Sequence, residues 1–205
     1  MRKSRFPLPH FLVTFLLLPF IIAPSKAKVE IKRVGQKVIA DDARFTVISP
    51  SLIRLEYSPQ GKFVDEPSIL VQDREWGKVD YEVREENGWL VLKTKMMTLR
   101  YKLGSGAFNR ENLSISWRIA KEQMIWRPGD KDQLNLGGTV AALDGVSREN
   151  LPPFPPGILS RSGYFFLDDT PHPLWDVKEE WWKSRLLLPS RIGISSAMDI
   201  TILSL

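Results

Sequence analysis

The sequence predicts an all-β protein built as an antiparallel β-sandwich. Three observations support this prediction. Short runs alternate between apolar and polar residues, turn-forming residues separate these runs, and no helical pattern of ten residues or more is present. One polar face per strand is typical of antiparallel sheets that cover a core on one side. Two sheets packed face to face bury such apolar faces, so a sandwich is the expected architecture.

The alternating runs lie mainly in the first 120 residues. In one of them Ile53, Leu55 and Tyr57 alternate with Arg54 and Glu56, which is the period of a half-buried strand. The stretch from residue 79 to residue 119 is expected to form a meander of three or four strands. The predicted strands cover residues 44–48, 51–58, 79–83, 90–92, 97–102 and 113–119, with one more at 163–167.

Turn residues fall between these runs. Asn87-Gly88 is the strongest hairpin signal, because both central residues of such a turn must tolerate positive φ. Ser58-Pro59-Gln60-Gly61 and Gly104-Ser105-Gly106 mark two further turns. From residue 128 the chain becomes rich in glycine and proline, which predicts a long irregular stretch. A loop of that length in a compact domain is usually functional or disordered.

The N-terminus has the pattern of a secretion signal. Three cations precede Phe11–Ala23, an apolar run that is shorter than a membrane-spanning helix requires. The small residues Ser25 and Ala27 follow, so residues 1–27 are expected to be a signal peptide cleaved after Ala27. The alternative is an uncleaved anchor. The chain is therefore expected to be periplasmic or secreted, with no membrane attachment after cleavage.

The charge pattern argues against a nucleic-acid partner. The full chain has 29 Lys and Arg residues against 24 Asp and Glu residues, and a net charge of +5. Four of the basic residues lie in the predicted signal, so the remaining chain is nearly neutral. A neutral chain lacks the electrostatic footprint of a DNA-binding domain.

Residue counts exclude some kinds of site, and the remaining candidates are ambiguous. Without cysteine, and with His172 as the only histidine after the signal, a zinc site of His and Cys ligands is excluded, and we expect no metal and no cofactor. Adjacent acids such as Asp168-Asp169 point to opposite faces of a strand and form no catalytic pair by themselves. The cluster of Trp175, Trp181 and Trp182 fits a packed core or interface, although an exposed indole can also stack on sugar rings.

Several segments resemble the N-terminal domain of glycoside hydrolase family 31, the retaining α-glucosidases and α-xylosidases. Two of them flank a proline-rich insert: Leu136-Gly-Gly-Thr-Val-Ala-Ala-Leu-Asp-Gly-Val146 and Leu159-Ser-Arg-Ser-Gly-Tyr-Phe-Phe-Leu-Asp-Asp-Thr170. Phe45–Ser58 and Phe63–Ser68 are similar to the opening segments of the family. The resemblance covers about residues 29–185.

The resemblance implies a galactose-mutarotase-like β-sandwich over residues 28–185, placed before a (β/α)₈ barrel that carries both catalytic aspartates. It also implies a loop that reaches the barrel mouth and contributes an acid to the binding site of an α-linked carbohydrate. Asp144 in Leu143-Asp144-Gly145 matches that acid, with Arg161 and Asp168 as weaker substrate-binding candidates. An Asp-Gly turn without a ligand is the alternative for Asp144. No catalytic residue is assigned, and we expect this chain alone to be inactive, since it lacks the aspartates of the barrel.

Residues 186–205 depart from the family pattern. We expect this tail to lack strand alternation, whereas the family continues with a segment like Asp-Trp-Tyr-Phe-Phe-Gly-Tyr-Gly-His. Codons for Arg191–Ile200, when read from the third base of the first codon, can spell that segment. A frameshift between about Trp182 and Arg191 would then explain the tail, and the missing partner would be the catalytic barrel.

A second function class stays open. The chain could be a stand-alone carbohydrate-binding or scaffolding sandwich that uses tryptophan faces for sugar contact.

Overall fold

The computed structural model describes residues 29–74, 76–138, 147, 149, 156–184 and 198–204, the last of these by backbone only. These residues form thirteen strands and no helix. They accordingly contain no helix long and apolar enough to cross a membrane. The predicted secretion signal, residues 1–27, lies outside the described residues. The prediction of an all-β chain is confirmed.

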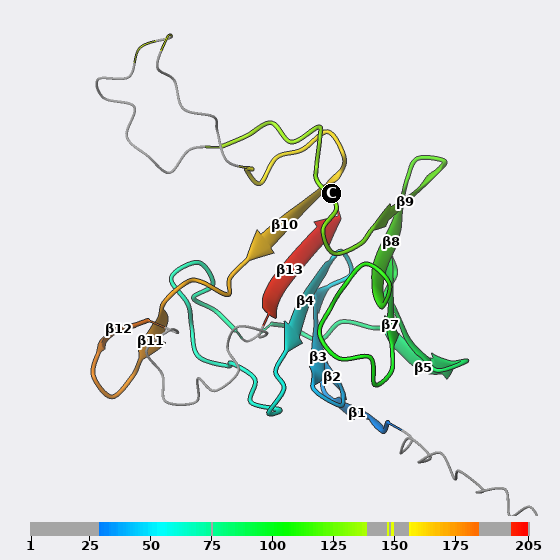
Figure 1. The fold of residues 1–205 in the computed structure, drawn as a ribbon, viewed down its shortest axis with the longest axis horizontal. Coiled ribbons are helices and arrows are strands. Elements are labelled where there is room, and N and C mark those ends of the chain that lie inside the picture. The colour runs from blue at the N-terminus through cyan, green and yellow to red at the C-terminus, as the bar shows by residue number, and fades with distance from the viewer. Residues whose placement is uncertain are drawn as a thin grey trace, which may run out of the picture.

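Two antiparallel sheets make up most of the molecule (Figure 1). The first sheet has six strands in the order β1-β2-β3-β4-β13-β10, and the second is a meander of five strands, β5 to β9. A short hairpin of β11 and β12 stands apart from both. The strands are β1 (Ile31–Val34), β2 (Lys37–Ala40), β3 (Ala43–Ser49), β4 (Leu52–Tyr57), β5 (Glu82–Glu86), β6 (Trp89–Lys93), β7 (Met97–Lys102), β8 (Leu113–Ile119), β9 (Glu122–Trp126), β10 (Tyr164–Asp168), β11 (Leu174–Asp176), β12 (Trp181–Lys183) and β13 (Met198–Ser204).

The core lies between the two sheets and is rich in aromatic contacts. Phe45 on β3 packs against Tyr101 on β7, with ring centroids 5.4 Å apart. At the other end of the sandwich, Tyr164 on β10 lies 5.3 Å from Trp117 on β8. Alternate residues of both sheets fill the space between these contacts and are almost fully buried. The two sheets therefore form one sandwich, as the alternation predicts.

The hairpin between β5 and β6 has the predicted turn. Asn87 and Gly88 both have positive φ, at 51° and 78°. An Asn-Gly pair adopts this conformation at low cost, and the resulting twist matches that of the two strands. The register then places Glu86 opposite Trp89.

The outer face of β3 and β4 is polar but buried. Arg44 donates from Nε to Oε2 of Glu56 at 2.6 Å and from Nη2 to Oε1 at 2.8 Å. Arg54 lies on the same face, with its Nη2 3.1 Å from Oε1 of Glu56. All three side chains are at most 5% exposed. The bidentate geometry compensates for the loss of water around these charges.

The segment that covers this polar face is residues 62–74, which form part of the connection between β4 and β5. We call this segment the strap. Its Val64 carbonyl accepts hydrogen bonds from Arg44 and Arg54, both at 2.9 Å. Its Asp65 lies 3.0 Å from Nη1 of Arg44. Burial alone would lower the pKa of Arg44, but the hydrogen bonds and charges of Glu56 and Asp65 raise it. The first sheet is therefore covered on both faces near β3 and β4.

The described part of the tail forms a strand in the first sheet. β13 pairs antiparallel with β4 on one side and with β10 on the other (Figure 1). The expectation of a tail without strand alternation does not hold for residues 198–204. Met198, Ile200 and Ile202 alternate with Asp199 and Thr201. The origin of the tail in a shifted reading frame stays a prediction.

Candidate functional site

The three candidate site residues lie in different places. Asp144 lies outside the described residues. Arg161 is exposed in the turn before β10, where its backbone N–H donates to the Leu134 carbonyl at 3.1 Å. Asp168 is exposed at the far end of β10 and accepts a hydrogen bond from the Thr170 N–H at 2.9 Å. Strand β10 alone, from Tyr164 to Asp168, spans about 13 Å and lies between the two residues, so the structure places them at opposite ends of that strand.

Two described segments flank residues 139–155, which include Asp144. Residues 132–138 and 156–162, which we call the stem, run side by side next to the start of β10 (Figure 1). An isolated bridge pairs Asn135 with Ser160, and the Leu136 N–H donates to the Leu159 carbonyl at 3.0 Å. The stem therefore fixes the points at which the chain leaves for residue 139 and returns from residue 155.

The amide of Asn135 is the centre of the stem. Its Oδ1 accepts from the N–H groups of Gly157 and Gly137, at 2.8 and 2.9 Å. Its Nδ2 donates to the Gly157 carbonyl at 2.9 Å and to Asp132 Oδ2 at 3.2 Å. An amide side chain has two donors and two acceptor positions, so these four bonds use its full capacity. Asn135 thus ties together both segments of the stem.

Gly157 allows the close approach of these two segments. A Cβ atom built on Gly157 would lie 2.4 Å from the carbonyl oxygen of Gly137, which no side chain can accommodate. The last residue of the proline-rich insert is therefore a glycine for a steric reason. Any larger residue at position 157 would push the two segments apart.

Asp132 completes the hydrogen bonding of the stem. Its Oδ1 accepts from the Ser162 hydroxyl at 2.6 Å and from the Leu134 N–H at 3.2 Å. Partial burial would raise the pKa of Asp132, but hydrogen bonds from Ser160, Ser162 and Asn135 lower it below the ordinary value. The nearby charge of Asp132 adds to burial in raising the pKa of Tyr164. The carboxylate is thus held in its charged form as a structural acceptor.

The stem exposes several apolar side chains. Four aliphatic side chains are about half exposed or more, at 48–66% of their full accessibility: Leu134, Leu136, Ile158 and Leu159. Exposed apolar side chains gathered in one short region are typical of a surface that meets another molecule or domain. We call these four residues the apolar stem patch.

Phe63–Ser68, one of the segments quoted for the resemblance, meets the end of β10 in a buried network. The Ser68 hydroxyl donates to Asp169 Oδ1 at 2.7 Å, and Arg74 Nη2 donates to Asp169 Oδ2 at 2.8 Å. Asp169 is 1% exposed. Asp169 therefore anchors the strap, while its neighbour Asp168 faces solvent.

The chemistry that the described residues offer is binding and positioning. Among them, no group of three His, Asp or Glu side chains could hold a metal ion. His172 follows the strap anchor, and its backbone N–H donates to the Asp169 carbonyl at 3.2 Å. The stem can hold the two ends of the segment between residues 138 and 156 at fixed positions next to β10.

The residues that build this stem carry only weak signals in the sequence and are not among the predicted site residues. Asn135 stands directly before the first quoted segment, and Gly157 is the last residue of the proline-rich insert. An Asx residue followed by glycine two positions later is a turn signal and could have drawn attention to Asn135. Nothing in the local sequence indicates that its partner lies 22 residues further on.

The described chain defines an all-β protein with two facing antiparallel sheets. No family model matches this chain, and no curated protein is similar to it in sequence. Among solved structures it is similar to a GH31 α-xylosidase from Xanthomonas citri, with a TM-score of 0.32 and 17% sequence identity. That similarity is weak. It covers 55% of this chain and only 14% of the α-xylosidase chain.

Proposed function

We propose that this chain is the β-sandwich domain of an exported glycoside hydrolase of the family 31 type. In this proposal the loop between residues 138 and 156 contributes Asp144 to the binding site of an α-linked sugar. A (β/α)₈ barrel supplies the catalytic aspartates. The partners would thus be an α-linked carbohydrate and that barrel, with neither nucleic acid nor membrane involved, and the location would be periplasmic or secreted.

The observation that carries the proposal is the stem. Asn135 fixes both points at which the loop departs and returns, through bonds to Gly137 and Gly157. A binding loop needs such a fixed base, because each degree of freedom lost on binding weakens the affinity. A stretch of 17 residues can extend at most about 28 Å from its base and return, which is enough to reach a neighbouring domain.

The apolar stem patch supports the same proposal. Exposed leucine and isoleucine side chains at the base of the loop would be covered by a barrel docked against this end of the sandwich. The polar residues Arg161 and Asp168 would then serve as bracing residues at the two ends of β10. The quoted sequence segments support the family assignment; they include part of the stem and the two residues of the strap anchor, Ser68 and Asp169.

Sequencing the gene through codon 180 and beyond tests the proposal at its root. The expected result is a second frame that continues with Asp-Trp-Tyr-Phe-Phe-Gly-Tyr-Gly-His and then encodes a barrel. A locus without barrel coding in any frame would overturn it.

Activity assays of the purified chain give an independent test. We expect no turnover of aryl α-glycosides, because retaining hydrolysis needs two carboxylates that the barrel would supply. Turnover that disappears in Asp144→Asn would contradict the assignment of catalysis to a barrel.

A further inference from the structure

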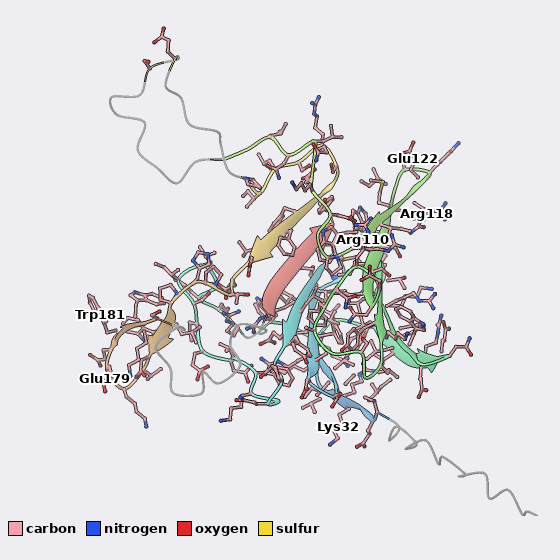
Figure 2. All side chains as sticks on the ribbon, viewed as in Figure 1. Lys32, Arg110, Arg118, Glu122, Glu179 and Trp181 are labelled. Atoms are coloured by element: carbon pink, nitrogen blue, oxygen red, sulfur yellow. The ribbon has the colours of Figure 1, made fainter. Side chains whose placement is uncertain are left out.

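The β11–β12 hairpin carries a well-defined exposed face. Trp181 is 70% exposed and stands directly opposite Asp176 in the register of the hairpin. Residues directly opposite each other in an antiparallel pair share one face of the sheet. Lys183 lies two positions after Trp181 on β12 and therefore also belongs to this face. Figure 2 shows Trp181 and Glu179 on this hairpin, at the side of the molecule away from β9. This face thus combines an indole, a carboxylate and an ammonium group, and its remaining member, Leu174 opposite Lys183, is buried.

The opposite face of the hairpin holds the other two tryptophans. Trp175 and Trp182 are also directly opposite each other, and their rings pack edge to face with centroids 5.2 Å apart. Both are partly buried. Trp181 therefore lies on the other face of the hairpin from the tryptophan pair that stabilises it.

The polar groups beside Trp181 are held in place. Lys183 Nζ lies 2.6 Å from Asp176 Oδ2. Asp176 Oδ1 accepts hydrogen bonds from the N–H groups of Lys178 and Glu179, at 2.8 and 3.0 Å. These bonds fix the turn between the strands and lower the pKa of Asp176 to about 2, with Lys183 as the main cause. The carboxylate is thus charged and oriented at neutral pH.

The strap holds the base of the hairpin. Ser68 forms an isolated bridge with Leu174, and the Trp175 N–H donates to the Pro67 carbonyl at 2.8 Å. The Ile69 N–H donates to the Pro173 carbonyl at 3.2 Å. A hairpin fixed in this way loses little conformational entropy when it binds a ligand.

We propose that this face, formed by Trp181, Asp176 and Lys183, binds neutral carbohydrate. The indole of Trp181 stacks on the apolar C–H face of a sugar ring, and the hydroxyls at the ring edge bond to Asp176 and Lys183. A hydroxyl both donates and accepts, so a sugar can satisfy the carboxylate and the ammonium together. This inference is independent of the loop at Asp144 and of a catalytic barrel.

The charges of the hairpin favour this ligand class over others. Asp176, Glu179 and Glu180 stand against Lys178 and Lys183, so neither a polyanion nor an anionic membrane gains net attraction. An apolar protein surface docked on Trp181 would remove water from the Asp176–Lys183 pair without replacing its hydrogen bonds, at a large desolvation cost. A sugar replaces those bonds.

Titration with maltohexaose and xylohexaose tests the proposal. The indole N–H resonances of the purified chain are followed by NMR, since each of its 7 tryptophans contributes one resonance. We expect saturable shifts that are largest for Trp181. Trp181→Ala should weaken binding about tenfold, and Trp181→Tyr, which keeps an aromatic ring, by about threefold or less. Lys183→Met, which keeps the stem of the side chain but not the charge, should also weaken binding.

Ile125→Ala on β9 is the matched control, because Ile125 is an exposed apolar residue on a different strand at 49% exposure. Its affinity should equal that of the unchanged chain. Absence of saturable shifts with either oligosaccharide would overturn the proposal, as would equal affinity in Trp181→Ala. Concentration-dependent dimers in size-exclusion chromatography that disappear in Trp181→Ala, and that neither sugar dissociates, would instead assign the face to a second copy of the chain.

Discussion

Asp168 and Asp169 are neighbours in the chain but have opposite environments. Asp168 is exposed and accepts a hydrogen bond from the nearby Thr170 N–H. Asp169 is buried and accepts hydrogen bonds from Ser68 and Arg74. Adjacent residues at the end of a strand point to opposite sides, so only one of them can reach the strap. Which one does so is decided by the register of β10, not by residue type.

Replacing Asp169 with asparagine should destabilise the protein by about 3 kcal/mol, because Arg74 would keep its charge in a buried site without its carboxylate. Urea unfolding followed by tryptophan fluorescence measures the effect. Asp168→Asn is the matched control, and its effect should stay within about 0.5 kcal/mol. Equal effects of the two variants would contradict the assignment of the anchor to Asp169.

Asp132 should give the stem a dependence on pH. Its pKa is lower in the folded protein than the ordinary value of 3.8, so its contribution to stability is present above that value. The contribution is lost as the pH falls below 3.8 through the folded-state pKa. The protection factors of the stem amides, which remove the intrinsic pH dependence of hydrogen exchange, should therefore fall in acid, and Asp132→Asn should reduce that fall. The same acid response in the variant would show that other carboxylates control the stem.

At the scale of elements, the stem depends on a contact between two glycines. Gly157→Ala places a methyl group against the Gly137 carbonyl, so the two segments must separate and Asn135 must lose bonds. We expect a destabilisation of about 2 kcal/mol, together with loss of exchange protection at the stem amides. Gly77→Ala is the control, since its Cβ would meet nothing within 4 Å, and it should change stability by less than about 1 kcal/mol. Similar effects of both changes would exclude a special role for Gly157.

The strands that the sequence predicts well are those with one apolar and one polar face. The predictions at residues 97–102 and 113–119 coincide with β7 and β8, and the alternation of β3 and β4 locates them within about a residue. β1 and β9 were missed because they are edge strands whose exposed residues need not alternate. β11 and β12 have only three residues each, too few for a period to show.

The site was less predictable than the fold because its contacts are distant in sequence. The Ser68–Asp169 bond spans 101 residues and the Asn135–Gly157 bond spans 22. The alternation of apolar and polar residues is a local pattern and cannot reveal pairs that are so far apart in the sequence. The candidates Asp144, Arg161 and Asp168 came from the resemblance to a family, and their roles as ligands of a sugar stay predictions.

At the scale of the whole molecule, the sandwich has one end that is apolar and open to solvent. The apolar stem patch lies there, beside the start of β10, and Phe166 on β10 is also 40% exposed. A monomer rarely leaves such a cluster uncovered, because contact with a second apolar surface removes it from water.

We therefore expect the isolated chain to associate as its concentration rises. Size-exclusion chromatography with light scattering should show the average mass increasing with loading, and the double variant Leu136→Ser with Ile158→Ser should reduce that increase. Both side chains are more than half exposed, so the folded state should tolerate the changes. A monomer at all concentrations would show that the patch does not drive association.

The covered polar face of β3 and β4 also restricts how this sequence can drift during evolution. Arg44 contacts both Glu56 and Asp65, and Arg54 shares the Glu56 carboxylate, so loss of Glu56 would take one carboxylate away from two buried guanidinium groups at once. Relatives should therefore exchange these residues as a group, for example by replacing the whole set with apolar side chains. On the outer face of the second sheet the charges pair in contact with water, as Arg84 does with Glu86, so a change at one position costs little and these residues can vary one at a time.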